Sequence, residues 1–193
     1  RLIEQVADLL RKDQLIIYPT DTSYAFGCRL GAKDALEKLK QIRALDDKHQ
    51  FTLLCRDLSE IANYAAVDNV QFKQLKAHTP APITFILNAT KDVPKKLAHA
   101  KKKTIGIRVP SNPIAQALLA AMDEPILTSS LILPHRDEIL DDPFEIEELL
   151  GNQIDGLINA GIKTTKLTTI VDMTTNQPEI IRQGAADVSS LVP

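Results

Sequence analysis

Apolar and polar positions repeat along the chain in two patterns, one typical of helices and one typical of buried strands. Apolar residues recur at helical spacing between Leu2 and Leu10, which predicts a helix over this segment. The continuous apolar run Leu15-Ile16-Ile17-Tyr18 predicts a buried strand, which Pro19 ends. The chain is therefore expected to open with a helix that leads into a strand.

The same two patterns predict the remaining elements. Helical spacing returns at 35–44, 59–64, 69–77, 114–122 and 144–150. A short apolar run covers 24–30, and strands are predicted at 51–55, 83–87, 103–109, 126–129, 154–158, 168–172 and 179–182. Because the last three strands follow one another without long connections, the pattern favours an α/β fold with flanking helices and a mixed, largely antiparallel sheet.

Length and composition indicate one folded domain over residues 1–193. A chain of 193 residues that is 44% hydrophobic can bury a substantial core. An aromatic content of 4% without Trp argues against a surface that binds single strands by base stacking. Cys28 and Cys55 are too few for a disulfide framework and lack the paired spacing of a zinc site. We therefore expect a cytoplasmic protein, and no apolar run reaches the roughly 18 residues of a membrane helix.

Charge is balanced overall and uneven locally. A net charge of −2 does not point to nucleic acid or to an anionic membrane as a partner. The segment from Lys91 to Lys103 nevertheless carries six lysines and one acid, and the segment from His135 to Glu148 carries seven acids and one arginine. Two solvated faces are the simpler interpretation of these runs when they are considered alone.

Familiar nucleotide motifs are missing, so any phosphate must be held by side chains. With seven glycines, the chain contains neither the phosphate-loop pattern nor the dinucleotide fingerprint. Hydroxyl and guanidinium groups at strand ends can jointly receive carboxylate and phosphate oxygens. The candidates are Thr20, Thr22, Thr104, Arg108, Thr128, Ser129, Ser130, Thr168, Thr169 and Arg182. The four histidines are scattered, without the spacing of a metal site or a catalytic triad.

Several of these groups lie in motifs that carry a resemblance to a known family. The motifs are Tyr18-Pro-Thr-Asp-Thr-Ser-Tyr-Ala-Phe-Gly27, Pro80-Ala-Pro-Ile-Thr84, Thr104-Ile-Gly-Ile-Arg108-Val-Pro110, Thr168-Thr-Ile-Val-Asp172 and Ile181-Arg-Gln-Gly184. Together they resemble the YrdC-like family, whose best-known members are threonylcarbamoyl-AMP synthases. The stretch from Phe51 to Glu60 resembles the YciO branch. The resemblance covers nearly the whole chain in the right order.

The resemblance implies a twisted sheet with a concave ligand-binding surface and a defined chemistry. Its ligands would be L-threonine, bicarbonate and ATP with Mg²⁺, without a tightly bound cofactor. The threonine amine would capture bicarbonate, and the resulting carbamate would attack the α-phosphate and release pyrophosphate. The product serves the modification of an adenosine in certain tRNAs. Positioning and charge neutralisation would supply most of the catalysis.

The resemblance also assigns roles to individual residues. Thr20 and Arg108 would hold the amino acid, and Thr168 stands where the family has a serine that touches the same ligand. Arg43, Thr104 and Arg182 match nucleotide contacts. Ser129 and Ser130 fall in the family's Ser-Ala-Asn loop, where Ser129 would face threonine and Ser130 would face ATP. The family's histidine falls near Leu54 or Cys55, and neither replaces it. No metal ligand from the protein is implied.

Two positions depart from the synthase pattern. The family's Lys-x-Arg-Pro signature reads Gln41-Ile42-Arg43-Ala44 here, and the asparagine of the Ser-Ala-Asn loop is Leu131. Losing a charged partner at a phosphate typically costs a few kcal/mol, which corresponds to a rate lowered roughly a hundredfold or more. Lys40 lies three residues before Arg43 on the predicted helix, so the two can share a face.

Three functions therefore stay open. The chain can be a nucleotidyltransferase of the threonylcarbamoyl-AMP synthase type. It can be a module that binds double-stranded RNA or tRNA, with phosphate contacts from Lys101, Lys102 and Lys103. It can also be a nucleotide sensor without turnover. The sequence does not determine the oligomeric state.

Overall fold

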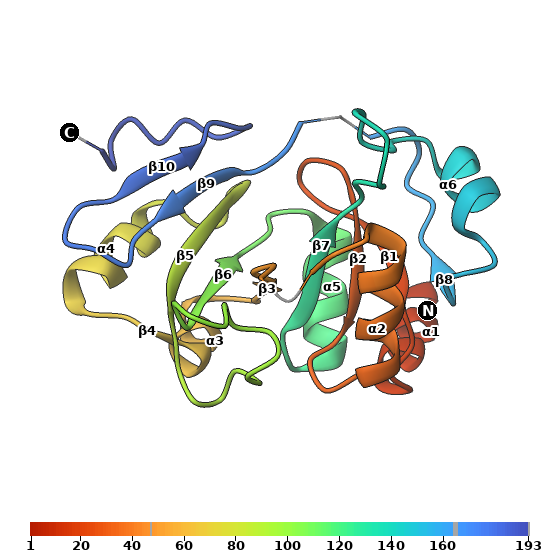
Figure 1. The fold of residues 1–193 in the computed structure, drawn as a ribbon, viewed down its shortest axis with the longest axis horizontal. Coiled ribbons are helices and arrows are strands. Elements are labelled where there is room, and N and C mark those ends of the chain that lie inside the picture. The colour runs from red at the N-terminus through yellow and green to blue at the C-terminus, as the bar shows by residue number, and fades with distance from the viewer. Residues whose placement is uncertain (47, 164–165, 193) are drawn as a thin grey trace.

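The computed structural model describes residues 1–193 except 47, 164–165 and 193, and it contains one ten-stranded sheet with helices on both faces (Figure 1). The described helices are α1 (Leu2–Arg11), α2 (Lys33–Arg43), α3 (Leu58–Tyr64), α4 (Asn69–Ala77), α5 (Pro113–Met122) and α6 (Pro143–Leu150). The strands are β1 (Ile16–Pro19), β2 (Tyr24–Arg29), β3 (Thr52–Leu54), β4 (Ala65–Ala66), β5 (Ile83–Ala89), β6 (Thr104–Arg108), β7 (Ile126–Ser130), β8 (Gly156–Leu157), β9 (Thr169–Asp172) and β10 (Glu179–Arg182). Most elements begin and end within two residues of their predicted positions.

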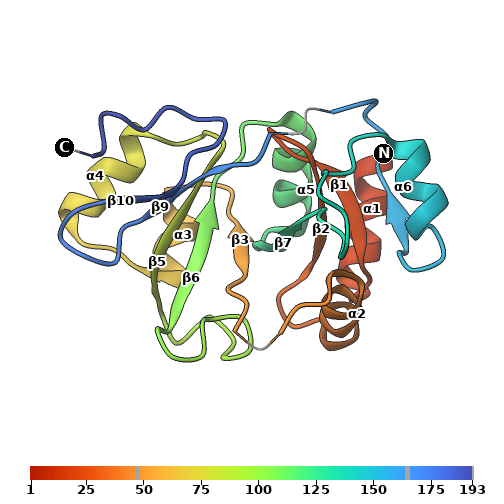
Figure 2. The same cartoon turned by 45° about the horizontal axis from the view of Figure 1, so that its top comes forward.

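The strand order confirms the mixed, largely antiparallel sheet. Along the sheet the order is β10-β9-β5-β6-β3-β7-β2-β1-β8, and β4 pairs with β5. Three neighbouring pairs are parallel, namely β1 with β8, β3 with β6, and β5 with β9. Figure 2 shows β3 in the middle of the twisted sheet, between a half that ends at β10 and a half that ends at β8.

The last three strands of the chain are divided between the two ends of this sheet. β8 pairs with β1 at one edge, whereas β9 and β10 pair with each other at the opposite edge. The predicted strand at 154–158 is also reduced to two residues. Gly156 packs against α1, and a Cβ there would lie 2.7 Å from a Leu9 methyl group. This close packing fixes the short strand beside β1.

Apolar side chains cover the two faces of the sheet unequally. Leu53, Leu127 and Ile107 belong to a large cluster that spans one face. On the other face Leu54 and Ile126 pack with α1 and α5 in a second, smaller cluster. Neighbouring side chains of a strand point to opposite faces, so Thr52 lies on the same face as Leu54, beyond the helices. The face thus changes from apolar to polar at the edge of α5.

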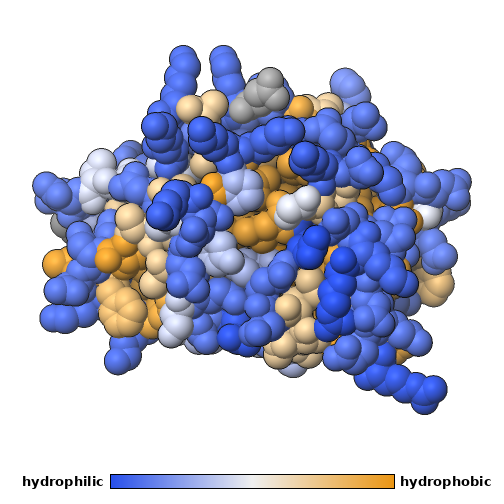
Figure 3. All heavy atoms as spheres, turned by 90° about the horizontal axis from the view of Figure 1, so that it is seen from below, coloured by the Kyte–Doolittle hydropathy of each residue, from blue (hydrophilic) through white to orange (hydrophobic). Residues whose placement is uncertain are grey.

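The outer surface is mostly polar. Figure 3 shows hydrophilic residues over most of the face seen from below, with smaller apolar patches between them. Within the part of the chain that the structure describes, none of the helices combines the length and the hydropathy that crossing a membrane requires.

Candidate functional site

A cavity of about 160 Å³ opens on the polar part of the sheet face. Seven of the candidate residues line it together: Arg43, Arg108, Thr128, Ser129, Ser130, Thr168 and Arg182. The described lining contains three arginines and several hydroxyl groups, and it contains no Asp or Glu. The cavity is therefore suited to an anionic ligand.

Arg108 is the most deeply buried of the three arginines. It is the last residue of β6 and is only 6% exposed. Its Nε and Nη2 atoms are buried without a hydrogen-bond partner, and burial lowers the pKa of its guanidinium. A buried cation without a partner costs free energy. A guanidinium offers two parallel N–H groups to a carboxylate. The Nε and Nη2 atoms of Arg108 are therefore suited to bind a carboxylate.

Arg182 is fixed by Thr168 on the neighbouring wall of the cavity. Its Nε donates to the Thr168 carbonyl oxygen at 3.0 Å, and its Nη2 donates to the Thr168 hydroxyl at 3.1 Å. That hydroxyl lies 2.9 Å from the hydroxyl of Thr84. Burial and then the charge of Arg108 lower the pKa of Arg182. The positive charges of Arg108 and Arg182 are therefore close enough to interact, and both line the cavity.

Arg43 closes a third side and is already bonded to protein. From the end of α2, its Nη1 donates to the Ser129 hydroxyl at 2.5 Å and its Nε donates to the Ile132 carbonyl oxygen at 3.1 Å. These bonds hold the segment after β7 against α2. Arg43 still faces the cavity, but it has fewer free N–H groups for a ligand than Arg108 has.

His49 also lines the cavity, although its position in the sequence indicated no partner. Burial, and then the charge of Arg43, lower its pKa to about 4. Its ring packs edge-on against Phe51, with the ring centroids 4.8 Å apart. At neutral pH His49 is therefore uncharged, and it contributes a polar but neutral side chain to the cavity lining.

The low pKa of His49 predicts a pH dependence of stability. The unfolded chain binds a proton near pH 6.5 and the folded chain only near pH 4, so stability falls as pH drops through this window. We expect His49→Gln to reduce that acid loss by on the order of 1–3 kcal/mol. Thermal melts between pH 4 and pH 7 measure it. Equal acid sensitivity of both proteins would contradict the assignment, and His78→Gln, whose site lies away from the cavity, is the control.

Other predicted residues lie outside the cavity lining. The Thr20 hydroxyl is bonded within its own turn, where it donates to the Ser23 carbonyl oxygen at 2.5 Å. Thr104 lies in a neighbouring hollow and donates to the side-chain oxygen of Gln50, which lines both spaces. Lys101, Lys102 and Lys103 are exposed just before β6. Their roles in binding stay predictions.

The positions that depart from the synthase pattern also point away from the cavity. Leu131 is fully buried in the larger apolar cluster, and Gln41 is exposed. The Lys40 Nζ lies 3.9 Å from the Glu37 Oε1. Lys40 lines a separate hollow together with Lys95 and Lys96. In this conformation Lys40 does not supply the missing cation.

Sequence patterns missed part of the lining. Gln50, Thr52, Thr84, Ile132 and Ile170 all line the cavity. The available signal was alternation, since Thr52 and Thr84 are polar residues inside otherwise apolar strands. On β6, Gly106 lies between them, and a Cβ there would be 2.5 Å from the Thr52 hydroxyl and 3.1 Å from the Thr84 methyl. Gly106 therefore keeps this part of the cavity open.

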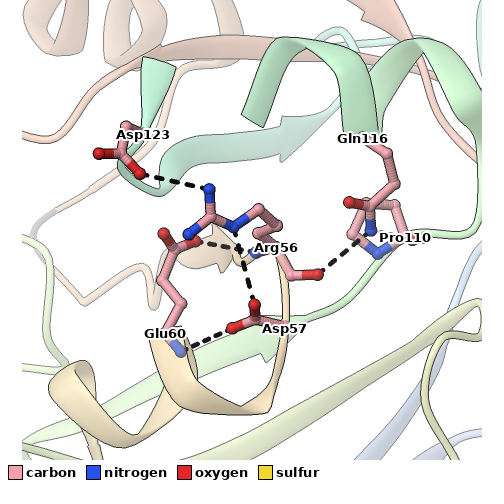
Figure 4. Close-up of polar contacts among 6 residues, drawn as sticks. All are labelled: Arg56, Asp57, Glu60, Pro110, Gln116 and Asp123. Carbon is pink, nitrogen blue, oxygen red and sulfur yellow. Dashed lines mark hydrogen bonds and ion pairs between the residues drawn. The ribbon is translucent and has the colours of Figure 1, made fainter. Parts of the chain in front are cut away.

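A polar cluster braces the chain just after Arg108 (Figure 4). The Gln116 side-chain amide donates to the Pro110 carbonyl oxygen at 2.6 Å and to the Arg56 carbonyl oxygen at 3.3 Å. The Arg56 N–H donates to the Glu60 carboxylate at 2.8 Å, and the Arg56 guanidinium pairs with Asp123 at 3.2 Å. This cluster joins the segments that follow β3 and β6 to α5 and its C-terminal end.

The described residues contain no group of three His, Cys, Asp or Glu side chains that could hold a metal ion.

A family model and a bacterial protein of known structure are similar to this chain. A family model named for Sua5, YciO and YrdC, with the description "Telomere recombination", matches residues 8–184. The uncharacterized protein YciO of Escherichia coli is 50% identical over 188 residues, which are 97% of this chain and 91% of that protein. Its crystal structure matches with a TM-score of 0.95, over 100% of this chain and 93% of that chain.

Two more distant proteins have names that state an activity or a ligand. The threonylcarbamoyl-AMP synthase of Vibrio vulnificus is 25% identical over 186 residues, covering 94% of this chain and 98% of the synthase. The crystal structure of P. abyssi Sua5 complexed with L-threonine has a TM-score of 0.88 at 20% identity, over 97% of this chain and 55% of that chain. This last likeness is one of fold.

Proposed function

The chain belongs to the Sua5/YciO/YrdC family, and from this premise we propose that its cavity binds the carboxylate of L-threonine beside a nucleotide. The observation that carries the proposal is Arg108, whose buried Nε and Nη2 have no hydrogen-bond partner among the described residues. A carboxylate satisfies both groups at once. The fold shared with a Sua5 that holds L-threonine supports the choice of amino acid.

The nucleotide is proposed to be ATP with Mg²⁺, with its phosphates near Arg43 and Arg182. In the proposed reaction the amine of threonine attacks bicarbonate and water leaves, which forms a carbamate. A carbamate oxygen then attacks the α-phosphorus of ATP, and pyrophosphate carries away the bonding electrons. Ser129, Ser130 and Thr168 would orient the ligands, while Arg182 offsets the charge that develops on phosphate oxygens.

Calorimetry with L-threonine, followed by a pyrophosphate-release assay with ATP, Mg²⁺ and bicarbonate, tests the two parts separately. We expect binding of L-threonine and a pyrophosphate rate roughly a hundredfold or more below that of a synthase with the full basic signature. Thermal stabilisation by ATP without release of pyrophosphate would instead favour a nucleotide sensor. No binding of threonine to folded protein would refute the proposal.

Binding of double-stranded RNA or tRNA is a second candidate. It is favoured by Lys101, Lys102 and Lys103, which are exposed and form no ion pair among the described residues. Affinity for duplex RNA at low salt should fall steeply as salt increases. Replacing the three lysines by Glu should remove it, whereas replacing Lys12, Lys33 and Lys76 should have less effect. Equal losses in both triple variants would contradict a specific role.

A further inference from the structure

Asp21 joins the turn after β1 to the segment that follows Arg108. Its Oδ1 accepts the Ser111 N–H at 3.0 Å and the Asn112 N–H at 2.5 Å, and its Oδ2 accepts the Ser111 N–H at 2.9 Å. In return, the Asn112 side-chain amide donates to the Thr20 carbonyl oxygen at 3.2 Å. The Asn112 side-chain oxygen caps α5 by accepting the N–H groups of Ile114 and Ala115. Four bonds between segments ninety residues apart thus lock the two loops together.

Asp21 is also the charge that opposes the burial of Arg108. Burial lowers the pKa of Arg108, and the nearby Tyr18 and Asp21 counteract that shift. Burial raises the pKa of Tyr18 to about 12, so its hydroxyl is uncharged at neutral pH. Of these two groups, only Asp21 then carries a negative charge. Among the described residues, Asp21 nevertheless forms no ion pair with Arg108. The Nε and Nη2 atoms of Arg108 have no hydrogen-bond partner there.

We propose that Asp21 is a positioning residue with two roles: it fixes the end of β6, and it holds the counter-charge of Arg108 at a distance. The backbone N–H groups of Ser111 and Asn112 restrain the carboxylate, so it stabilises the buried guanidinium without occupying the N–H groups that face the cavity. An Asp free to rotate onto Arg108 would compete with the ligand for them. The part of this proposal that concerns the ligand rests on the proposed function.

Two substitutions at this position separate the two roles. In Asp21→Asn the side-chain oxygen can occupy the place of Oδ1, which accepts two backbone N–H groups, while the charge is lost. In Asp21→Ala both the hydrogen bonds and the charge are lost. Asp68 supplies the matched control, because its carboxylate caps α4 by accepting the Gln71 N–H at 2.7 Å, away from the cavity.

We expect the two variants to change carboxylate affinity in opposite directions. Asp21→Asn removes a negative charge that repels an anion, so affinity should rise roughly threefold to tenfold. Asp21→Ala releases the end of β6 and should lower affinity roughly tenfold or more. The probe is 3-hydroxybutyrate, which is threonine without its ammonium group, so that attraction between Asp21 and an amine does not enter. Ligand-observed NMR measures both constants, and the Asp68 variants should leave them unchanged. Equal losses in both Asp21 variants would overturn the counter-charge role.

A second measurement needs no ligand. If Asp21 stabilises the charge of Arg108, Asp21→Asn should lower the melting temperature of the parent chain by about 2–4 °C. It should lower the melting temperature of an Arg108→Met chain clearly less, because the partner charge is gone. Equal shifts in both backgrounds would refute the inference. If the parent chain bound neither L-threonine nor 3-hydroxybutyrate, the proposed function would be refuted. The melting-temperature shifts in the two backgrounds would then still test the interaction between Asp21 and Arg108.

Discussion

Replacing Arg108 by Met is expected to abolish binding of L-threonine while raising the stability of the folded chain. The buried Nε and Nη2 have no protein partner, so the folded state bears their desolvation cost, and Met removes it while keeping much of the side-chain volume. We expect the free energy of unfolding to rise by about 1–3 kcal/mol and the affinity for L-threonine to fall roughly a hundredfold or more. Denaturant unfolding and calorimetry on the same protein measure both.

The opposite signs of these two effects distinguish a binding residue from a structural one. Arg136→Met is a suitable control, because Arg136 pairs with Glu145 on the surface at 2.8 Å, and exposed pairs contribute little. That variant should change neither quantity much. If Arg108→Met lowered the free energy of unfolding as well as the affinity for L-threonine, the guanidinium would be required for the fold. Its unbonded Nε and Nη2 would then no longer argue for a ligand.

The sequence predicted the class of the sheet better than the order of its strands. Periodicity located the buried strands because apolar runs are a local property. The place of β8 beside β1 depends on contacts between distant segments, such as the Leu15 N–H bonded to the Asp155 carboxylate at 2.9 Å. No local pattern reports such a contact, so the sequence did not predict which strand β8 would join.

The candidate site shows the same division. The strand-end rule and the family resemblance identified Arg108, Thr168 and Arg182, which the fold brings to one cavity. His49 was missed because no motif marks it, and its packing against Phe51 and its closeness to Arg43 depend on how the chain folds between α2 and β3. Thr104 fits the motif but lies in the adjoining hollow beside Gln50, so its role stays a prediction. Side-chain direction on a twisted strand, rather than residue type, separates these cases.

Gly106→Ala is expected to damage the cavity and the fold together, through one contact. The new Cβ would lie 2.5 Å from the Thr52 hydroxyl and 3.3 Å from the Phe51 carbonyl oxygen, so β3 or its side chain must move. Overpacking of this kind typically costs about 1–3 kcal/mol. Because Thr52 lines the cavity, the shift should also weaken L-threonine binding by roughly tenfold.

A double variant tests whether that contact is the cause. Thr52→Ala removes the hydroxyl that the new methyl group meets, so Gly106→Ala should cost clearly less stability in a Thr52→Ala chain than in the parent. Gly31→Ala is the matched control, since a Cβ there meets nothing within 4 Å. If the cost of Gly106→Ala were the same in both backgrounds, the strain would lie with the backbone of Phe51 instead. The space above Gly106 would then be limited by β3 itself, which no side-chain change could relieve.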